Sequence, residues 1–161
     1  MRAEPDAGFP ERMPPFDPRS KPAEVRGTNI IKSINDSTGM CSLNANGNPN
    51  ILKLTSDALS AVAGWNPSRE ELWAVGERIV NLERAFNVRH GLTPKDDYIV
   101  SERLVEPPPA GPGAGKSIKP YLKGMVHEYY RLMGWDEKRG KPWASTLKRL
   151  GLEDVAEDLW G

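Results

Sequence analysis

Apolar and polar residues alternate with a helical period along most of this chain, and the clearest pattern lies between Ser68 and Gly91. Apolar side chains recur there at spacings of three and four residues, which is the repeat of a helix with one apolar face. The run Ser68–Glu71 has the form of a capping box, so it marks the start of this helix. The apolar stripe consists of Leu72, Val75, Ile79, Leu82 and Phe86. We expect this helix to form the core.

Shorter patterns predict further helices on both sides of it. Pro22 suits a first helical turn, and Gly64 and Gly134 have the position of C-terminal caps. The predicted ranges are 22 to about 35, 51–63, 117–133, 142–150 and 152–159. The expected inward side chains are Val25, Ile30, Ile31 and Ile34 in the first of these helices, and Leu122, Met125, Val126, Tyr129 and Leu132 in the one that ends at Met133.

Proline and glycine, 15 of each, concentrate in the loops. We expect residues 1–20 to be a Pro-rich connector or disordered tail, and residues 21–161 to be one helical domain. Residues 44–50 have the composition of a loop, and a short extended piece is predicted at 98–105. The predicted fold is therefore all-α, an irregular orthogonal bundle of five or six helices with long Pro/Gly-rich loops.

Composition excludes several classes of protein. A chain of 161 residues is long enough for one hydrophobic core. It carries 22 basic and 22 acidic residues, and this zero net charge argues against binding to nucleic acid or to anionic membranes. There is no apolar run of membrane-spanning length and no signal-peptide pattern at the start. The single cysteine excludes an internal disulfide and is consistent with a reducing cytoplasm.

That cysteine lies in a turn, Asp36–Cys41, which is the most informative segment for function. Gly39 allows a sharp bend at positive φ, so the turn can direct an acid and a thiol toward one neighbour. One thiolate cannot hold a zinc ion or an iron–sulfur cluster, which need about four ligands. Cys41 is thus either a packed thiol or one ligand of a site completed elsewhere. Asp36 is either a local turn acid or a ligand contact.

Several segments together resemble the C-terminal part of the tungsten-containing aldehyde ferredoxin oxidoreductase family. They follow one another in the order seen in that family, namely Asp36–Cys41, Asn81–Gly91, Lys95–Asp97, Glu102–Pro107 and Glu128–Asp136. The resemblance extends from about Pro22 to Leu152. It implies that the chain is the C-terminal domain of a larger enzyme that oxidises aldehydes to carboxylic acids and passes electrons to ferredoxin.

The resemblance also implies the roles of the turn. Asp36 would contact the pterin cofactor, with Gly39 and Met40 beside it, although the family usually has leucine at the position of Met40. Cys41 would be the last of four ligands to a [4Fe–4S] cluster, whose other three cysteines lie in an upstream segment that this sequence does not contain. The parent enzyme would hold a tungsten or molybdenum bis-pterin and this cluster.

For the isolated chain we expect neither cofactor nor activity, and we assign no catalytic residue. Its partners would be the upstream domains of the enzyme, and ferredoxin for the parent. We also expect apolar surface around Met40 to drive self-association. The alternative is a non-catalytic helical interaction module.

Other polar residues have two readings each. Those on the edge of the long helix either face solvent or lie near the cofactor, namely Glu83, Arg84, Asn87 and Arg89. Asp96, Asp97 and Arg103 either cap a turn or line the approach to the active site. The family usually has an acid where His90 stands, which leaves no role for that position, and His127 is expected at the surface. Residues 110–117 imitate a phosphate-binding loop, but three prolines replace the strand that such a loop requires.

Overall fold

The computed structural model describes residues 16–41 and 50–161, and this part of the chain is all-α, as predicted. It contains seven α-helices, one of only four residues, and a single turn of 3₁₀-helix. In chain order the elements are α1 (Lys21–Thr38), α3 (Ile51–Ala63), α4 (Arg69–Arg89), η2 (Asp96–Tyr98), α5 (Glu102–Val105), α6 (Leu122–Met133), α7 (Ala144–Arg149) and α8 (Glu153–Trp160). Among the described residues, no helix combines the length and apolarity needed to span a bilayer.

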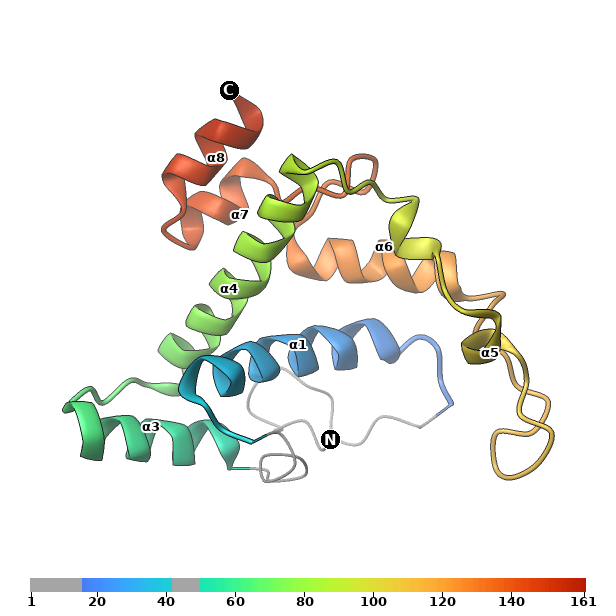
Figure 1. Cartoon of the computed structure of the whole chain (residues 1–161), viewed down its shortest axis with the longest axis horizontal. Coiled ribbons are helices and arrows are strands. Elements are labelled where there is room, and N and C mark those ends of the chain that lie inside the picture. The colour runs from blue at the N-terminus through green and yellow to red at the C-terminus, as the bar shows by residue number, and fades with distance from the viewer. Residues whose placement is uncertain (1–15, 42–49) are drawn as a thin grey trace.

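α4 crosses α1 obliquely, whereas α1, α3 and α6 lie roughly parallel to one another (Figure 1). α1 packs against both α4 and α6, and α3 packs against α4. α7 and α8 form a pair that contacts α4 through α8. η2 lies against α6. α4 therefore contacts α1, α3 and α8, and α1 connects α4 to α6.

One hydrophobic core lies where these helices meet. α1 supplies Ile30, Ile31 and Ile34 to it, as the sequence predicted, whereas Val25 is largely exposed. The other fully packed members are Ile51, Leu52, Leu72, Val80, Tyr130, Met133 and Trp135. Burial of side chains of this size stabilises the fold by about 1.5–3 kcal/mol each before the loss of conformational entropy is counted.

α1 and α4 approach closely because α4 carries Gly76 at the crossing. A Cβ atom built on Gly76 would lie 2.5 Å from the carbonyl oxygen of Ile30 and 2.8 Å from its Cγ2. Only glycine fits at that distance, so the crossing depends on this residue.

Most predicted helix boundaries agree with the structure. α3 spans the predicted 51–63 and ends at Gly64, whose φ is 66°. The capping box is present, because Ser68 Oγ accepts from the Glu71 amide at 3.1 Å and the Ser68 amide donates to Glu71 Oε2 at 2.7 Å. α6 ends at Gly134 as expected, and α7 and α8 are the two predicted short closing helices.

Three boundaries differ from the prediction. α1 continues to Thr38 instead of ending near Asn35. α6 begins at Leu122 and not at Ser117, because the Ser117 hydroxyl accepts from the Lys119 amide and holds a turn. The extended piece predicted at 98–105 is wrong, since η2 and α5 occupy this region and α5 stops before the first of three prolines. The predicted loop at 44–50 and tail at 1–20 lie mostly outside the described residues.

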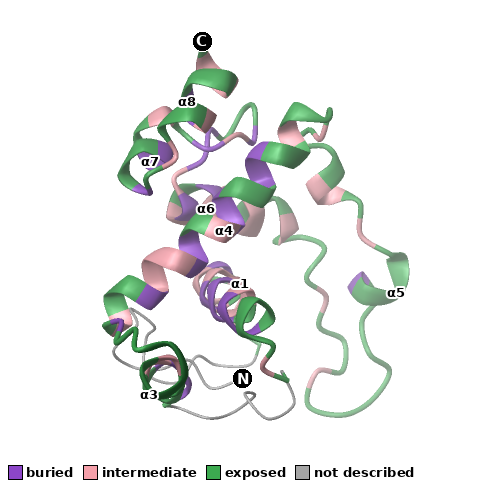
Figure 2. Ribbon diagram, turned by 60° about the vertical axis from the view of Figure 1, so that its left-hand side comes forward, coloured by how far each residue is buried: buried purple, intermediate pink, exposed green. Residues whose placement is uncertain are grey.

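The apolar stripe of α4 is the main correction. We expected all five of its side chains to be buried, but only Leu72 is, and Leu82 and Phe86 are 45% and 61% exposed. Figure 2 shows buried and exposed segments alternating along this helix. The face that points inward carries Leu72, Gly76, Glu77, Val80, Asn81, Arg84 and Ala85. Three of these are polar residues, and their partners explain why this face is buried.

Candidate functional site

The predicted cofactor turn is a structured helix end. Gly39 has a φ of 70°, in the left-handed region that glycine adopts without strain. The Met40 amide donates to the carbonyl of Asn35 at 2.9 Å, and the Gly39 amide donates to that of Asp36 at 3.4 Å. This pair of bonds is the Schellman arrangement, which satisfies the last carbonyls of α1. The backbone of the turn is therefore positioned by the helix itself.

The two predicted ligand groups of this turn face outward. Asp36 lies on the last turn of α1, where its carboxylate accepts from Lys32 Nζ at 2.5 Å in an exposed pair. Cys41 is a free, exposed thiol. Met40 between them packs against the hydrophobic core and is only half-buried. The turn thus presents an acid and a thiol on a rigid base, while Met40 anchors it.

The turn carries one carboxylate and one thiol, so a metal or cluster at this place would need further ligands from elsewhere. Among the described residues, no group of three or more His, Cys, Asp or Glu side chains lies close enough to hold a metal ion. Asn35, directly before Asp36, is 1% exposed, and neither end of its side-chain amide has a hydrogen-bond partner. Buried amides are nearly always paired. Within the described chain, the side-chain amide of Asn35 is therefore an exception to this rule, directly before the turn.

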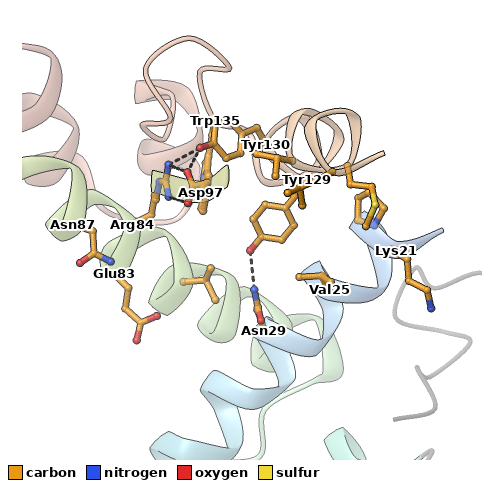
Figure 3. Close-up of a pocket in the computed structure, with 15 residues that line it drawn as sticks. Lys21, Val25, Asn29, Glu83, Arg84, Asn87, Asp97, Tyr129, Tyr130 and Trp135 are labelled. Atoms are coloured by element: carbon orange, nitrogen blue, oxygen red, sulfur yellow. Dashed lines mark hydrogen bonds and ion pairs between the residues drawn. The ribbon is translucent and has the colours of Figure 1, made fainter. Parts of the chain in front are cut away.

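A second polar centre lies around Arg84, which the sequence left either facing solvent or near the cofactor. Its guanidinium donates from Nη1 to Asp97 Oδ1 at 3.0 Å and from Nη2 to Asp97 Oδ2 at 2.7 Å. Nε donates to the carbonyl of Gly140 at 2.6 Å, and Nη2 also donates to the hydroxyl of Tyr130 at 2.8 Å. The Tyr130 hydroxyl donates to Asp97 Oδ2 in turn. Figure 3 shows these side chains converging.

Within this cluster the charges of Arg84 and Asp97 balance each other, and the Tyr130 hydroxyl bonds to both. Burial and the hydrogen bond to Asp97 both raise the pKa of Tyr130, so this phenol stays neutral. The Arg84 guanidinium also lies over the ring of Trp135, with Cζ 4.7 Å from the ring centre. Arg84 and Asp97 therefore hold η2, α6 and the loop before α7 together, which is a structural role.

Two further buried polar residues, Glu77 and Asn81, lie on the same face of α4 as Arg84. Asn81 accepts from Trp135 Nε1 at 2.8 Å and donates to the carbonyl of Glu77 at 2.9 Å. Glu77 is paired with Arg26 of α1 at 3.3 Å and with Arg149 of α7 at 3.0 Å. Sequence reasoning did not single out Glu77, Asn81 or Trp135 individually. The spacing of Glu77, Asn81 and Arg84 along α4 places them on one face of the helix, and Asn81 and Trp135 also lie in segments that carry the family resemblance.

A pocket of about 440 Å³ opens beside the Arg84 cluster, between α1, α4 and α6 (Figure 3). Its walls are mainly apolar, and Asn29 donates to the hydroxyl of Tyr129 at 3.0 Å on one side. The lining includes Val25, Val80, Leu122, Met125, Val126 and Tyr129. Ten residues of chain separate Asn29 from Gly39, which is roughly 15 Å along a helix. The pocket is therefore distinct from the cofactor turn.

The remaining candidates lie apart from both sites. Arg89 pairs with Asp158 of α8 at 3.0 Å, and the Nδ1 of His127 lies 3.1 Å from Glu137 at the surface. Asp96 accepts from the Thr93 amide and hydroxyl, which lowers the pKa of its carboxyl and makes it a turn cap. Arg103 is exposed on α5.

The segment that imitates a phosphate-binding loop has no strand before it. α5 precedes it, and the Ser117 hydroxyl donates to the carbonyl of Val105 at 2.5 Å. Among the described residues, the segment therefore lacks the strand–loop–helix context that phosphate binding requires.

Comparison with known proteins identifies the class. Residues 1–152 match the family described as aldehyde ferredoxin oxidoreductase, domains 2 and 3. The chain belongs to this family. It is 36% identical over 151 residues to the tungsten-containing aldehyde ferredoxin oxidoreductase of Pyrococcus abyssi, and 34% identical over 151 residues to that of Pyrococcus furiosus. Each match covers 91% of this chain but 24% of the relative, so the chain spans about a quarter of the length of these proteins.

A solved structure supports the fold over nearly the whole chain. The active-site complex BamBC of benzoyl coenzyme A reductase, in complex with 1,5-dienoyl-CoA, superimposes with a TM-score of 0.68 at 25% identity. The match covers 98% of this chain and 23% of the other. The helical arrangement described above is therefore one that occurs within larger redox enzymes.

Proposed function

We propose that this chain is the C-terminal helical domain of a tungsten or molybdenum pterin oxidoreductase that converts an aldehyde and water to a carboxylic acid. The reaction releases two electrons and two protons, and ferredoxin would take the electrons one at a time. The observation that carries the proposal is the turn after α1, which presents Asp36 and Cys41 outward on a rigid helix end in a chain of this family. The domain would comprise residues 21–161, preceded by a connector, in a cytoplasmic enzyme.

Each residue of the turn has a distinct task in this proposal. The Cys41 thiolate would supply one of four ligands to a [4Fe–4S] cluster. The Asp36 carboxylate, released from Lys32, would accept hydrogen bonds from N–H groups of the pterin, and bonds to an ionised acceptor are strong. Gly39 and Met40 would let the backbone approach the pterin. When bound, the metal–pterin centre and the cluster would supply the electron-accepting chemistry.

This division of tasks explains why we assign no catalytic residue to the chain and expect it to be inactive alone. The buried, unpaired amide of Asn35 supports the same view, because it indicates that neighbours of the turn come from outside the described residues. The turn and the Arg84 cluster would contribute cofactor contacts and a stable base.

The test uses Cys41→Ser and Asp36→Ala in the enzyme at its full natural length. Serine is a poor cluster ligand, so the first variant should lose iron while it keeps much of its tungsten. The second leaves pterin donors unpaired, at a cost of about 1–3 kcal/mol, and should lose tungsten more than iron. Metal analysis should therefore give iron-to-tungsten ratios that change in opposite directions.

Exposed Asp57→Asn on α3 is the matched control and should change neither metal. Wild-type iron, tungsten and activity in both turn variants would contradict the proposal. That result would favour the alternative, a non-catalytic helical interaction module.

A further inference from the structure

The outer side of α4 carries a surface that the cofactor turn does not explain. We call it the α4 rim and define it by Leu82, Glu83, Phe86 and Asn87, which line one hollow. Its two apolar side chains, Leu82 and Phe86, are 45% and 61% exposed. Such an apolar surface surrounding polar groups is typical of an interaction site.

The orientation of α4 is imposed by its opposite face. Glu77, Asn81 and Arg84 are themselves buried, and each has a partner on another element, as described above. Rotation of the helix to bury Leu82 and Phe86 would leave those polar groups without partners, which costs more than the exposed apolar side chains. The domain therefore holds the α4 rim outward.

The rim continues into the 440 Å³ pocket. Glu83 and Asn87 line both hollows, so apolar side chains lie on either side of this polar pair. Val25 and Met125 belong to the pocket side, and Val25 is itself 45% exposed. Figure 3 shows Glu83 and Asn87 on α4 next to the pocket. Together they form one continuous surface across α4, α1 and α6.

Two features indicate what this surface binds. The ring of Phe86 contacts that of His90 at a tilt, with centroids 4.2 Å apart, and an exposed aromatic side chain is a common component of interaction hot spots. Within the described part of the chain, neither the Glu83 carboxylate nor the Asn87 side-chain amide makes a hydrogen bond or ion pair. A complementary partner would bring apolar side chains and a basic group to meet Glu83.

We propose that the α4 rim and the adjoining pocket bind an apolar segment of the remaining part of the same enzyme, with a basic side chain opposite Glu83. This rests on the proposed function. The family relatives are about four times longer than this chain, since it spans 24% of them, so a large part of such an enzyme is available to cover this surface. The contact would join the domain to the rest of the enzyme at a place separate from the cofactor turn.

The test places a photo-crosslinking amino acid at position 86 of the enzyme at its full natural length, with the same substitution at Val62 as a control. Val62 is apolar and 89% exposed on α3, away from the rim. Irradiation and mass spectrometry should identify a cross-link from position 86 to a peptide outside residues 1–161, in a segment that contains arginine or lysine. Position 62 should give only background.

A second measurement uses Glu83→Lys and Leu82→Glu with Phe86→Glu. Glu83→Lys, made together with the cross-linker at position 86, should lower the cross-link yield by about tenfold. Leu82→Glu with Phe86→Glu, which carries no cross-linker, should make the domain boundary more sensitive to protease. In the 161-residue chain the same substitutions should leave the melting temperature unchanged, because these side chains already face solvent. Val62→Glu should change neither the protease sensitivity of the full-length enzyme nor the melting temperature of the 161-residue chain.

Three outcomes would overturn the inference. Cross-links from position 86 only to a second copy of the chain would assign the surface to self-association. No cross-link would remove the proposed contact, and so would variants with wild-type protease sensitivity. Iron and tungsten contents measured on the same samples report separately on the cofactor turn, so failure of this inference and failure of the proposed function are distinguishable.

Discussion

Arg84 of α4 and Asp97 of η2 face each other in a two-point ion pair, with N–O distances of 3.0 and 2.7 Å. Arg84 is buried, and its remaining donors bind the Gly140 carbonyl and the Tyr130 hydroxyl. One guanidinium therefore connects four segments that are far apart in sequence. Its geometry suits arginine specifically, because a lysine ammonium lacks the planar, forked donors.

We expect Arg84→Ala to be among the most damaging single substitutions. It would leave the partly buried Asp97 carboxylate and the Gly140 carbonyl without this donor, and unpaired polar groups of this kind cost about 1–3 kcal/mol. The free energy of unfolding from urea titration measures this cost. Arg89→Ala is the control, since it removes only the exposed pair with Asp158 and should cost about 0–1 kcal/mol. Equal effects of the two variants would contradict the assigned role.

Gly76→Ala should destabilise the domain although alanine favours helices. The new Cβ would lie 2.5 Å from the Ile30 carbonyl oxygen, so α1 and α4 must move apart, at a cost of about 1–3 kcal/mol. Gly124 on α6 has open space around it, so Gly124→Ala should stabilise by up to about 1 kcal/mol. Thermal unfolding of both variants checks this, and opposite shifts in melting temperature are expected. A stabilised Gly76→Ala would refute the close crossing.

Asp136 should contribute to acid sensitivity. Burial alone would raise the pKa of its carboxyl, but hydrogen bonds from the amides of Lys138 and Arg139 and from the Arg139 guanidinium outweigh burial and lower it. A folded-state pKa below the unfolded value of about 3.9 means that the unfolded chain binds more protons in acid. The contribution of Asp136 is therefore present above about pH 4 and is lost as the pH falls through the folded-state pKa.

Asp136→Asn should flatten this dependence. Urea midpoints measured between about pH 6 and pH 3 should fall less steeply for the variant than for the original chain. Asp57→Asn, which removes an exposed carboxylate on α3, provides the comparison. If the urea midpoint falls equally steeply with pH in Asp136→Asn and in the original chain, the Asp136 carboxylate does not contribute to the loss of stability in acid.

Local signals in the sequence were sufficient for the helices and the family. The capping box at Ser68, the glycines at 64 and 134 and the turn at Gly39 act through bonds between residues a few positions apart, so a local pattern reveals them. The order of motifs identified the aldehyde ferredoxin oxidoreductase family, which the match over residues 1–152 establishes. The roles of Asp36, Gly39, Met40 and Cys41 stay predictions.

The tertiary structure decided which face of α4 is buried, and it reversed our expectation for Leu82 and Phe86. Apolar periodicity shows which face of a helix is most hydrophobic, and from this we had expected that face to be buried. The periodicity does not predict which polar side chains become buried, because their hydrogen-bonding partners come from distant segments of the chain. These pairs are Glu77 with Arg149, Asn81 with Trp135, and Arg84 with Asp97. Each of these pairs joins residues whose proximity exists only after folding. The sequence by itself therefore determined the long helices and those ends that local capping bonds fix, whereas long-range hydrogen bonds determined the orientation of α4 and left the α4 rim facing outward.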